Sequence, residues 1–414
     1  MESNTDKHSV DEDYLWLTSE AASEMLQLAM TLIEEKTNPL KTAKLLRKTV
    51  SPQRSAIVME QATLRLRGRR KFTLADQMFF SGKSLEQSTS TVIANYKRRR
   101  FNGIDRIADI CCGIGGDLIS LAQRETNSSA LETVGVEKDP LVAHFANANI
   151  AALQIENASV DVCSFEDFDL TPFDGLHFDP DRRAKSRTTH GDLFLPSMPD
   201  IFSRLNRERQ LVAIKVAPAT DVDDSEQPIE REWIGDWREC KQQVVWSGPG
   251  IESAARLATV VAKDGTFFQF QHREDSSIKV PPVVDEIPQY IYEPHPSILA
   301  ARLRNVVADR YSLQPISRDV GYLSGNSLLA GVEPLLKGYR IDEVLPADLR
   351  VIQKKLRAMG VGKIVLKTRG VDQMLADRVS RLKLKGELKT TIMLTRHRRS
   401  RRALLVTRVN PSDA

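Results

Sequence analysis

Apolar side chains recur at helical spacing through the first quarter of the chain. Leu26 and Met30 belong to one such run, and prolines interrupt the pattern directly after Asn38 and Ser51. Both of these residue types favour turns and helix caps. We therefore predict an N-terminal domain of several helices over residues 14–102.

From residue 103 the pattern changes to short β-rich runs that alternate with helical segments. Helices are predicted over residues 117–123 and 140–153. Strands are predicted over residues 107–112, 133–137, 160–163, 175–179, 211–216 and 243–246. Helices between successive strands imply crossover connections. This order favours a mostly parallel, doubly wound α/β sheet over residues 103–273.

Two more apolar runs, over residues 258–262 and 266–270, flank the tripeptide Lys263-Asp264-Gly265. An Asp-Gly pair between such runs is a turn signal for an antiparallel hairpin. We expect this hairpin at the end of the sheet.

The last third of the chain begins with a polar, proline-containing linker at residues 274–289. We assign residues 274–338 to this linker and a small ferredoxin-like module. A small α+β domain is predicted over residues 339–410. Its expected elements are a strand, a helix at 346–359, a strand at 363–367, a helix at 371–382 and two final strands.

The composition is that of an ordinary globular protein of 414 residues. No apolar run approaches the roughly 18 residues that a membrane span needs. The polar, acidic residues 1–13 predict a disordered terminus without a secretion signal. The four cysteines lack paired spacing, so we predict no metal site, no disulfide framework and a cytoplasmic location. The oligomeric state is left open.

The net charge of +4 is modest, but basic residues gather in three clusters. The clusters cover residues 65–71, 97–100 and 396–402. The last contains Arg396, Arg398, Arg399, Arg401 and Arg402. Such clusters release counterions when they meet a phosphate backbone, which makes them candidate RNA contacts. Solvated faces and a hairpin turn are the alternative interpretation.

The most informative motif is Ile107-Ala-Asp-Ile-Cys-Cys-Gly-Ile-Gly-Gly-Asp117, a strand that runs through a glycine-rich turn into a helix. Gly113, Gly115 and Gly116 allow a tight turn and close approach of the backbone to a ligand. A dinucleotide-binding loop would have its third glycine where Leu118 stands. The sequence therefore favours S-adenosylmethionine, with Asp109 orienting its methionine end and the loop holding its carboxylate.

Carboxylates also stand at the ends of two later strands. Glu137 ends the second strand, where an acid can accept both ribose hydroxyls. Asp179 and Pro180 end the fourth strand, and ligands of open α/β sheets bind at this edge. An Asp carboxylate and an Asp-Pro carbonyl can accept the hydrogens of an exocyclic base nitrogen and direct its lone pair. We predict that Asp179 and Pro180 are catalytic, while Arg182 and Arg183 contact RNA phosphate or are simply solvated.

Three other kinds of residue have expected structural roles. Cys111 and Cys112 are expected to be buried thiols. His177 is expected to be a hydrogen-bonded core histidine. Trp233, Trp237 and Trp246 are expected to anchor cores.

The run Asp-Ile-Cys-Cys-Gly-Ile-Gly-Gly-Asp resembles the first motif of trimethylguanosine synthases and their bacterial relatives, which methylate guanine N2. The segment Gly135-Val-Glu-Lys-Asp-Pro140, with Asn149 after it, is similar to the second segment of that family. An antiparallel hairpin at the end of the sheet is likewise known from class I methyltransferases.

Over most of residues 14–409 the chain resembles bacterial class I methyltransferases that carry a THUMP-like C-terminal domain. The matching stretches are Ser84-Leu-Glu-Gln-Ser-Thr89, the box Asp179-Pro-Asp-Arg-Arg183, Tyr292-Glu-Pro-His-Pro296, Gly321-Tyr-Leu323 and Lys367-Thr-Arg-Gly-Val-Asp372. The resemblance implies a tail related to tRNA-binding modules. It also implies that Phe165 packs against the adenine of the cofactor, with Glu166 or Asp167 accepting from its amino group.

The sequence departs from the base N-methyltransferase pattern, in which a second proline and an aromatic residue follow the Asp-Pro pair. Asp181 and Arg182 occupy these positions, and an arginine plane can stack on a base. We predict an S-adenosylmethionine-dependent methyltransferase that acts on RNA, and specifically on an exocyclic nitrogen of a tRNA base such as guanine N2. The alternatives are a cofactor- or RNA-binding protein without catalysis, and a methyltransferase for small molecules or proteins.

Overall fold

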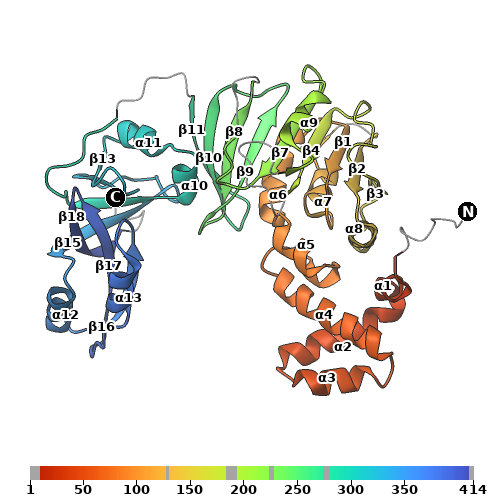
Figure 1. Cartoon of the computed structure of the whole chain (residues 1–414), viewed down its shortest axis with the longest axis horizontal. Coiled ribbons are helices and arrows are strands. Elements are labelled where there is room, and N and C mark those ends of the chain that lie inside the picture. The colour runs from red at the N-terminus through yellow and green to blue at the C-terminus, as the bar shows by residue number, and fades with distance from the viewer. Residues whose placement is uncertain (1–9, 127–129, 183–193, 223–227, 274–279, 410–414) are drawn as a thin grey trace, which may run out of the picture. The chain divides into compact units, whose positions relative to one another are not determined.

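The computed structural model describes residues 10–126, 130–182, 194–222, 228–273 and 280–409. The chain divides into two compact units (Figure 1). Unit 1 comprises residues 1–230, 243–252 and 261–266, and unit 2 comprises residues 231–242, 253–260 and 267–414.

Unit 1 begins with helices, as predicted. They are α1 (Glu12–Leu17), α2 (Ser23–Glu34), α3 (Pro39–Leu46), α4 (Pro52–Gly68), α5 (Gly82–Gln87) and α6 (Thr91–Arg98). The side chains of Asn38 and Ser51 accept from backbone N–H groups at the starts of α3 and α4, as expected of cap residues. Helix α1 begins at Glu12 behind an Asp11 cap, so the predicted disordered terminus extended too far along the chain.

The sheet of unit 1 has the strand order β9-β7-β4-β1-β2-β3. Its strands are β1 (Arg106–Ile110), β2 (Glu132–Glu137), β3 (Ala158–Val162), β4 (Gly175–Phe178), β7 (Leu211–Val216) and β9 (Cys240–Ser247, of which residues 243–247 belong to unit 1). Strands β3, β2, β1, β4 and β7 are parallel, and β9 runs antiparallel beside β7. The doubly wound α/β sheet is thus confirmed.

Helices pack onto this sheet through two apolar clusters. Helices α7 (Gly116–Ala122) and α8 (Pro140–Ala152) bury Leu118 and Ile150 against β3 residue Val160. Helix α9 (Met198–Ser203) buries Ile201 in a separate cluster with residues of β1, β4 and β7. The two-residue strands β5 (Asp181–Arg182) and β6 (Phe194–Leu195) pair with each other.

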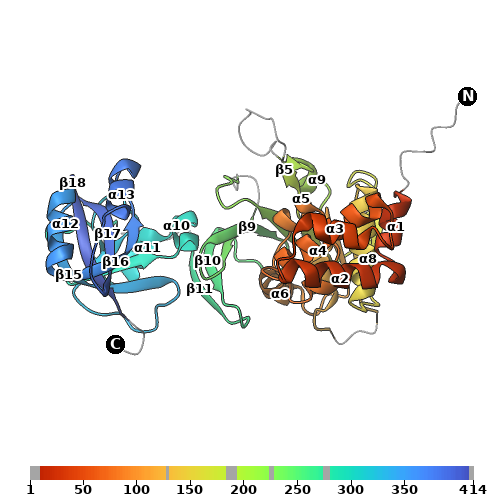
Figure 2. The same cartoon turned by 90° about the horizontal axis from the view of Figure 1, so that it is seen from below.

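The N-terminal helices share a core with the sheet region. Ile114 of the glycine loop and Phe145 of α8 are buried in the same cluster as Leu26 of α2 and Val58 of α4. Figure 2 shows α2, α3, α4 and α8 in the same part of unit 1. The predicted helical domain is therefore packed into the unit that contains the sheet.

Unit 2 contains β8 (Glu230–Gly235, from Arg231 onward), β10 (Ala255–Val261) and β11 (Phe267–Arg273). Strands β10 and β11 are neighbours joined at the predicted Lys263-Asp264-Gly265 turn. Strand β8 was not predicted, because charged residues obscure its pattern. Glu230 and Glu232 are nevertheless buried, and the Thr259 hydroxyl donates to Glu232 at 2.6 Å.

A second sheet of unit 2 has seven strands in the order β13-β14-β12-β15-β18-β17-β16. They are β12 (Tyr290–Pro294), β13 (Gln314–Pro315), β14 (Leu323–Gly325), β15 (Leu336–Pro346), β16 (Val361–Thr368), β17 (Leu388–His397) and β18 (Ser400–Arg408). The helices are α10 (Pro296–Ala300), α11 (Arg304–Arg310), α12 (Leu349–Ala358) and α13 (Gln373–Ser380). One sheet therefore joins the two modules that we had separated at residue 338, because β12 and β15 pair across that boundary.

The tryptophans follow the prediction only in part. Trp233 and Trp246 are buried, whereas Trp237 is 43% exposed. No helix of the described residues has the length and apolarity that a membrane crossing requires.

Candidate active site

The glycine-rich turn after β1 leaves open space beside Gly113. Gly113 and Gly115 have φ angles of +57° and +86°, which side-chain-bearing residues rarely adopt. A Cβ atom built on Gly113 would meet nothing within 4 Å. Gly116 begins α7, and its backbone packs tightly against the segment at Ser88 and Thr89.

Two side chains of the second βα segment hold this turn in place. The Glu137 carboxylate accepts from the N–H of Gly113 at 3.1 Å and from the N–H of Asp139 at 2.9 Å. The wholly buried Asn149 amide donates to the carbonyls of Ile114 and Phe79, and it accepts from the N–H of Phe79. Asn149 therefore joins the turn to the N-terminal helices, which explains its place in the motif.

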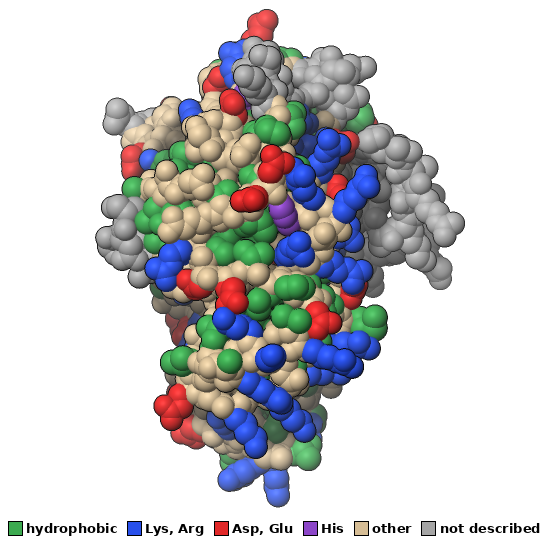
Figure 3. All heavy atoms as spheres, turned by 90° about the vertical axis from the view of Figure 1, so that its left-hand side faces the viewer, with side chains coloured by type: hydrophobic (Ala, Val, Ile, Leu, Met, Phe, Trp, Pro, Cys, Tyr) green, Lys and Arg blue, Asp and Glu red, His purple; other side chains and the backbone are tan. Residues whose placement is uncertain are grey.

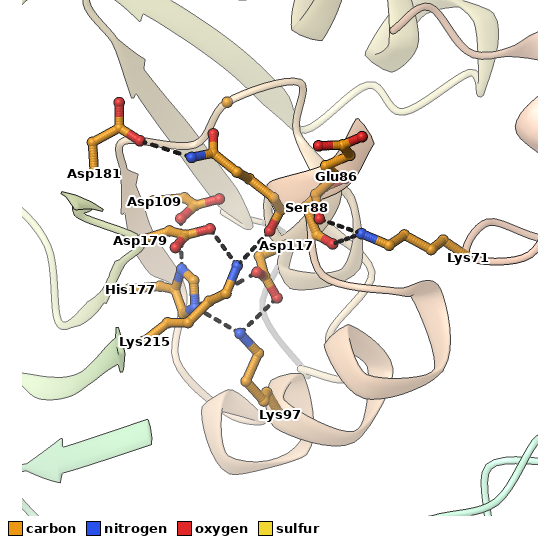
Figure 4. A network of polar contacts seen from close by, with 12 residues as sticks. Lys71, Glu86, Ser88, Lys97, Asp109, Asp117, His177, Asp179, Asp181 and Lys215 are labelled. Atoms are coloured by element: carbon orange, nitrogen blue, oxygen red, sulfur yellow. Dashed lines mark hydrogen bonds and ion pairs between the residues drawn. The ribbon is translucent and has the colours of Figure 1, made fainter. Parts of the chain in front are cut away.

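Beneath the turn lies a buried chain of polar side chains (Figure 4). His177 Nδ1 lies 2.6 Å from Asp109 Oδ1, and His177 Nε2 lies 2.9 Å from Lys97 Nζ. Lys97 Nζ in turn lies 2.8 Å from Asp117 Oδ1. Because an ammonium group only donates, His177 must accept at Nε2 and donate from Nδ1 to Asp109. The predicted core role of His177 is confirmed.

The two carboxylates of this hydrogen-bonded network, Asp109 and Asp117, have pKa values shifted in opposite directions. Burial raises the pKa of Asp109 above its ordinary value, although His177 opposes the rise. Burial acts in the same direction on Asp117, but the charges of Lys97 and Lys215 outweigh it and lower the pKa of Asp117. The Oδ2 atom of Asp109 is buried and has no hydrogen-bond partner among the described residues. One acceptor below the glycine turn is therefore unsatisfied.

Asp179 lies at the carboxyl end of β4 and is paired with a lysine that the sequence analysis did not identify. Lys215 of β7 places Nζ 2.6 Å from Asp179 Oδ2 and also donates to the Gln87 carbonyl at 3.0 Å. Burial would lower the pKa of Lys215, but Asp179 and Asp117 raise it above its ordinary value. The position of Lys215 near the end of a predicted strand could have identified it. Strands β4 and β7 are adjacent and parallel, so residues at their carboxyl ends meet at one edge of the sheet.

The segment that contains Ser84-Leu-Glu-Gln-Ser-Thr89 also contacts the Asp-Pro-Asp box. Lys83 Nζ lies 2.9 Å from Asp181 Oδ2, and the Gln87 amide donates to Asp181 Oδ1 at 3.3 Å. Lys71 donates to three carbonyls at the end of this segment, including that of Ser88 at 3.0 Å (Figure 4). The segment around this motif thus lies beside Asp179 and Asp181 and contacts Asp181 directly.

The remaining predicted site residues have varied surroundings. Phe165 is buried, with Phe178 edge-on at 5.8 Å and the Arg204 guanidinium 4.4 Å from its ring centre. Arg182 belongs to β5, and Arg183 lies outside the described residues. Burial raises the pKa of both Cys111 and Cys112, so these thiols stay protonated as expected of structural cysteines.

Several side chains of the first two basic clusters bind other groups of unit 1. Arg65 is buried and donates to the Met78 carbonyl, and Arg69 pairs with Asp76 at 2.7 Å. Lys97 belongs to the buried chain, and Arg100 pairs with Glu230. Our prediction of these clusters as candidate RNA contacts is therefore wrong for these side chains, because carboxylates and carbonyls of the fold bind them.

The third basic cluster forms the turn between β17 and β18. Arg396, Arg399 and Arg401 are exposed, and Arg402 is half-buried. Arg401 pairs with Asp372 at 2.8 Å, and Arg398 pairs with Asp285. Figure 3 shows lysine and arginine side chains gathered on the face of unit 2 that includes α12. Helix α12 alone adds the exposed cations Arg350, Lys354 and Arg357, which the sequence analysis had not selected.

Comparisons with known proteins agree with this architecture. Residues 336–408 match the family described as THUMP domain-like. An uncharacterized S-adenosylmethionine-dependent methyltransferase of Mycobacterium tuberculosis is 26% identical over 325 residues, which are 77% of this chain and 85% of the relative. It is matched equally in the strains CDC 1551 / Oshkosh and ATCC 25618 / H37Rv.

Among solved structures, the crystal structure of a protein proposed to be a methyltransferase, from Porphyromonas gingivalis W83, superposes with a TM-score of 0.73. It is 22% identical, and the alignment covers 93% of this chain and 98% of that one. This chain is therefore a protein of the class I S-adenosylmethionine-dependent methyltransferase fold, with a THUMP-like domain at residues 336–408.

Proposed function

We propose that this protein transfers the methyl group of S-adenosylmethionine to RNA, at an exocyclic nitrogen of a tRNA base. The observation that carries the proposal is the edge formed by β1, β2 and β4. An open glycine turn, Glu137 and Asp179 follow three adjacent parallel strands there. In open α/β sheets, ligands bind at this edge.

The residues at this edge fit the cofactor. The turn leaves room above Gly113, and the start of α7 offers N–H groups to a carboxylate. The unsatisfied Oδ2 of Asp109 would accept a hydrogen bond from the methionine end of the cofactor. Glu137 would accept hydrogen bonds from the ribose hydroxyls. S-adenosylmethionine supplies an electrophilic methyl group on a positively charged sulfur.

Asp179 and Pro180 would orient the base nitrogen that receives the methyl group. The Asp179 carboxylate and the backbone carbonyl of the Asp-Pro pair can accept the amino hydrogens and orient the nitrogen lone pair. Because Lys215 holds one carboxylate oxygen of Asp179, the other is left to face the substrate. In this arrangement Asp179 acts through positioning and electrostatics rather than as a strong base.

RNA as the substrate is supported by the THUMP domain-like match and by the exposed arginines of the β17–β18 turn. A base within a stem would have to be extruded into the site, which costs a few kcal/mol. Asp181, held by Lys83 and Gln87, occupies the position of the usual second proline. This departure is the observation that favours a cofactor-binding protein without catalysis as the second candidate.

The test uses methyl-labelled S-adenosylmethionine and bulk RNA from a strain that lacks the protein. The wild-type protein should label RNA, and Asp179→Ala should lose most of the turnover while its cofactor affinity, measured by calorimetry, stays similar. Asp174→Ala is the matched control, because Asp174 lies before the opposite end of β4 and pairs with Arg209 at the surface. Cofactor binding without RNA labelling would contradict the proposal and favour the second candidate.

Cofactor binding itself is tested with Gly115→Asp. Gly265→Asp is its control, because Gly265 has a nearly identical φ of +87° in the β10–β11 turn. Both substitutions introduce similar backbone strain, of about 1 kcal/mol or more. Only Gly115→Asp should abolish cofactor binding, and retained affinity in that variant would refute the assignment of the turn.

A further inference from the structure

Three family stretches of unit 2 that had no assigned chemistry meet around one carboxylate. Glu293 comes from the Tyr-Glu-Pro-His-Pro stretch on β12, and Tyr322 from the Gly-Tyr-Leu stretch. Lys367 and Arg369 come from the Lys-Thr-Arg-Gly-Val-Asp stretch at the end of β16. Three strands separate β12 from β16 in the sheet, yet the side chains of Glu293 and Lys367 meet.

The two carboxylate oxygens of Glu293 differ in their distances to the neighbouring cations. Glu293 Oε2 lies 2.5 Å from Lys367 Nζ and 3.4 Å from the Tyr339 hydroxyl. Glu293 Oε1 has Arg369 at 3.7 Å, which is too long for a hydrogen bond. The Arg369 guanidinium lies 5.4 Å from the centre of the Tyr322 ring, and a side chain at Gly321 would crowd it.

Tyr322 is wholly buried beside Arg369, whose guanidinium can donate to the Tyr322 hydroxyl but cannot accept from it. The hydroxyl proton therefore has no acceptor among the described residues, and a buried donor without an acceptor is costly. Next to it, the Arg369 guanidinium has donors that its distant carboxylate does not use. The hydroxyl of Tyr322 and the neighbouring guanidinium of Arg369 are thus both available to donate to an added acceptor.

The surrounding charge is positive. Lys337 is the register partner of Glu293 on β15, and burial, together with Lys367 and Arg408, lowers the pKa of Lys337. Arg408 pairs with Glu333 at 3.1 Å. Four cations therefore face two carboxylates in this partly buried region, and an added anion would relieve the excess.

An exposed aromatic ring adjoins one of these cations, Lys337. Lys337 Nζ lies 5.3 Å from the ring centre of Trp237, which is 43% exposed. Proteins that bind single-stranded nucleic acid combine a positively charged surface with exposed aromatic rings on which bases stack. The anion that fits is therefore a phosphate that carries a nucleoside.

We propose that Tyr322, Arg369, Lys367 and Lys337 form a binding site for a nucleotide phosphate in unit 2, with the base stacked on Trp237. The phosphate oxygens accept from the Arg369 and Tyr322 donors, and Glu293 competes with the phosphate for Lys367 and Arg369. The proposal does not depend on methyl transfer. The phosphate could come from a free mononucleotide or from an RNA chain.

The experiment measures binding to the full-length protein by calorimetry with inorganic phosphate, AMP and adenosine. Phosphate and AMP should bind, AMP more tightly, and adenosine should bind at least tenfold more weakly than AMP. Arg369→Gln should weaken AMP about tenfold, which is typical of one charge-assisted hydrogen bond. Tyr322→Phe should weaken AMP severalfold, and Trp237→Leu should reduce AMP to the affinity of phosphate.

Glu293→Gln separates a ligand site from an internal ion-pair cluster. Removing the competing carboxylate should strengthen phosphate binding severalfold, whereas a purely structural cluster would lose stability and gain no affinity. Arg350→Gln, on the exposed face of α12, is the control and should change nothing. Unfolding temperatures and near-ultraviolet circular dichroism check that each variant is folded.

A short single-stranded RNA without terminal phosphates distinguishes the two sources. If it binds with the same dependence on Arg369, the site takes backbone phosphate; if only AMP does, it takes a terminal or free phosphate. Equal affinity for adenosine and AMP, or unchanged AMP binding in both Arg369→Gln and Tyr322→Phe, would overturn the proposal.

Discussion

Lys215 and Asp179 form an ion pair of 2.6 Å between adjacent parallel strands, at the edge where ligands of this fold bind. Lys215 also donates to the Gln87 carbonyl and so joins Asp179 to the N-terminal helical region. The predicted catalytic carboxylate is thus oriented by a residue from β7 and by a segment outside the sheet.

Replacement of Lys215 should reduce turnover without loss of the cofactor. In Lys215→Met the Asp179 carboxylate loses a charge-assisted bond, and kcat should fall about tenfold to a hundredfold. The affinity for S-adenosylmethionine should change little, and Lys215→Arg should recover part of kcat. Steady-state kinetics with RNA and calorimetry with the cofactor measure both quantities. An additive rather than shared loss in Asp179→Ala/Lys215→Met would count against the coupling.

Asn149 should matter for both stability and cofactor binding. Asn149→Ala leaves the backbone groups of Phe79 and Ile114 without partners in a buried place, so we expect a loss of about 2–4 kcal/mol in the free energy of unfolding. The glycine turn should loosen, and cofactor affinity should fall as well. Chemical denaturation and calorimetry test this. Asn147→Ala, on the same helix but at an exposed position, should have a much smaller effect.

His295 should make unit 2 sensitive to acid. Burial lowers the pKa of His295 to about 4, although the hydrogen bond from its ring to the Asp236 carbonyl opposes the shift. The other ring nitrogen, Nδ1, accepts from the Ser297 N–H. The unfolded chain takes up a proton near the ordinary pKa of 6.5, while the folded chain does so only near 4. The folded state therefore loses stability as the pH falls from about 6.5 to 4, by roughly 3 kcal/mol in total.

The control for this acid step is His295→Asn, whose side chain can still cap α10 but does not titrate. Urea denaturation between pH 7 and pH 4 should show a shallower decline in that variant. An identical decline in both proteins would assign the acid sensitivity to other groups.

The arginines of the β17–β18 turn should set the salt dependence of RNA binding. In Arg396→Gln/Arg399→Gln the slope of log affinity against log salt should fall by about two, because each phosphate contact contributes about one. Fluorescence anisotropy with labelled tRNA at several salt concentrations measures the slope. Arg340→Gln is a suitable control, since Arg340 is exposed but already paired with Asp342. An unchanged slope would remove these arginines from the interface.

The sequence by itself determined the local structure around the cofactor loop. A strand that ends in glycines and opens a helix has few alternatives, because only glycine readily takes the left-handed angles at 113 and 115. Alternation of apolar runs and helices likewise determined the parallel sheet, and the cap residues marked where α3 and α4 begin.

Only the tertiary structure decided which charges are free and which are bound. Lys97, Arg65 and Arg100 read as parts of basic clusters, yet buried carboxylates and carbonyls satisfy them. Glu293 and Lys367 meet although 74 positions separate them in the chain. A local pattern records the period of a strand or helix, whereas an ion pair depends on which distant side chain shares the same low-dielectric space.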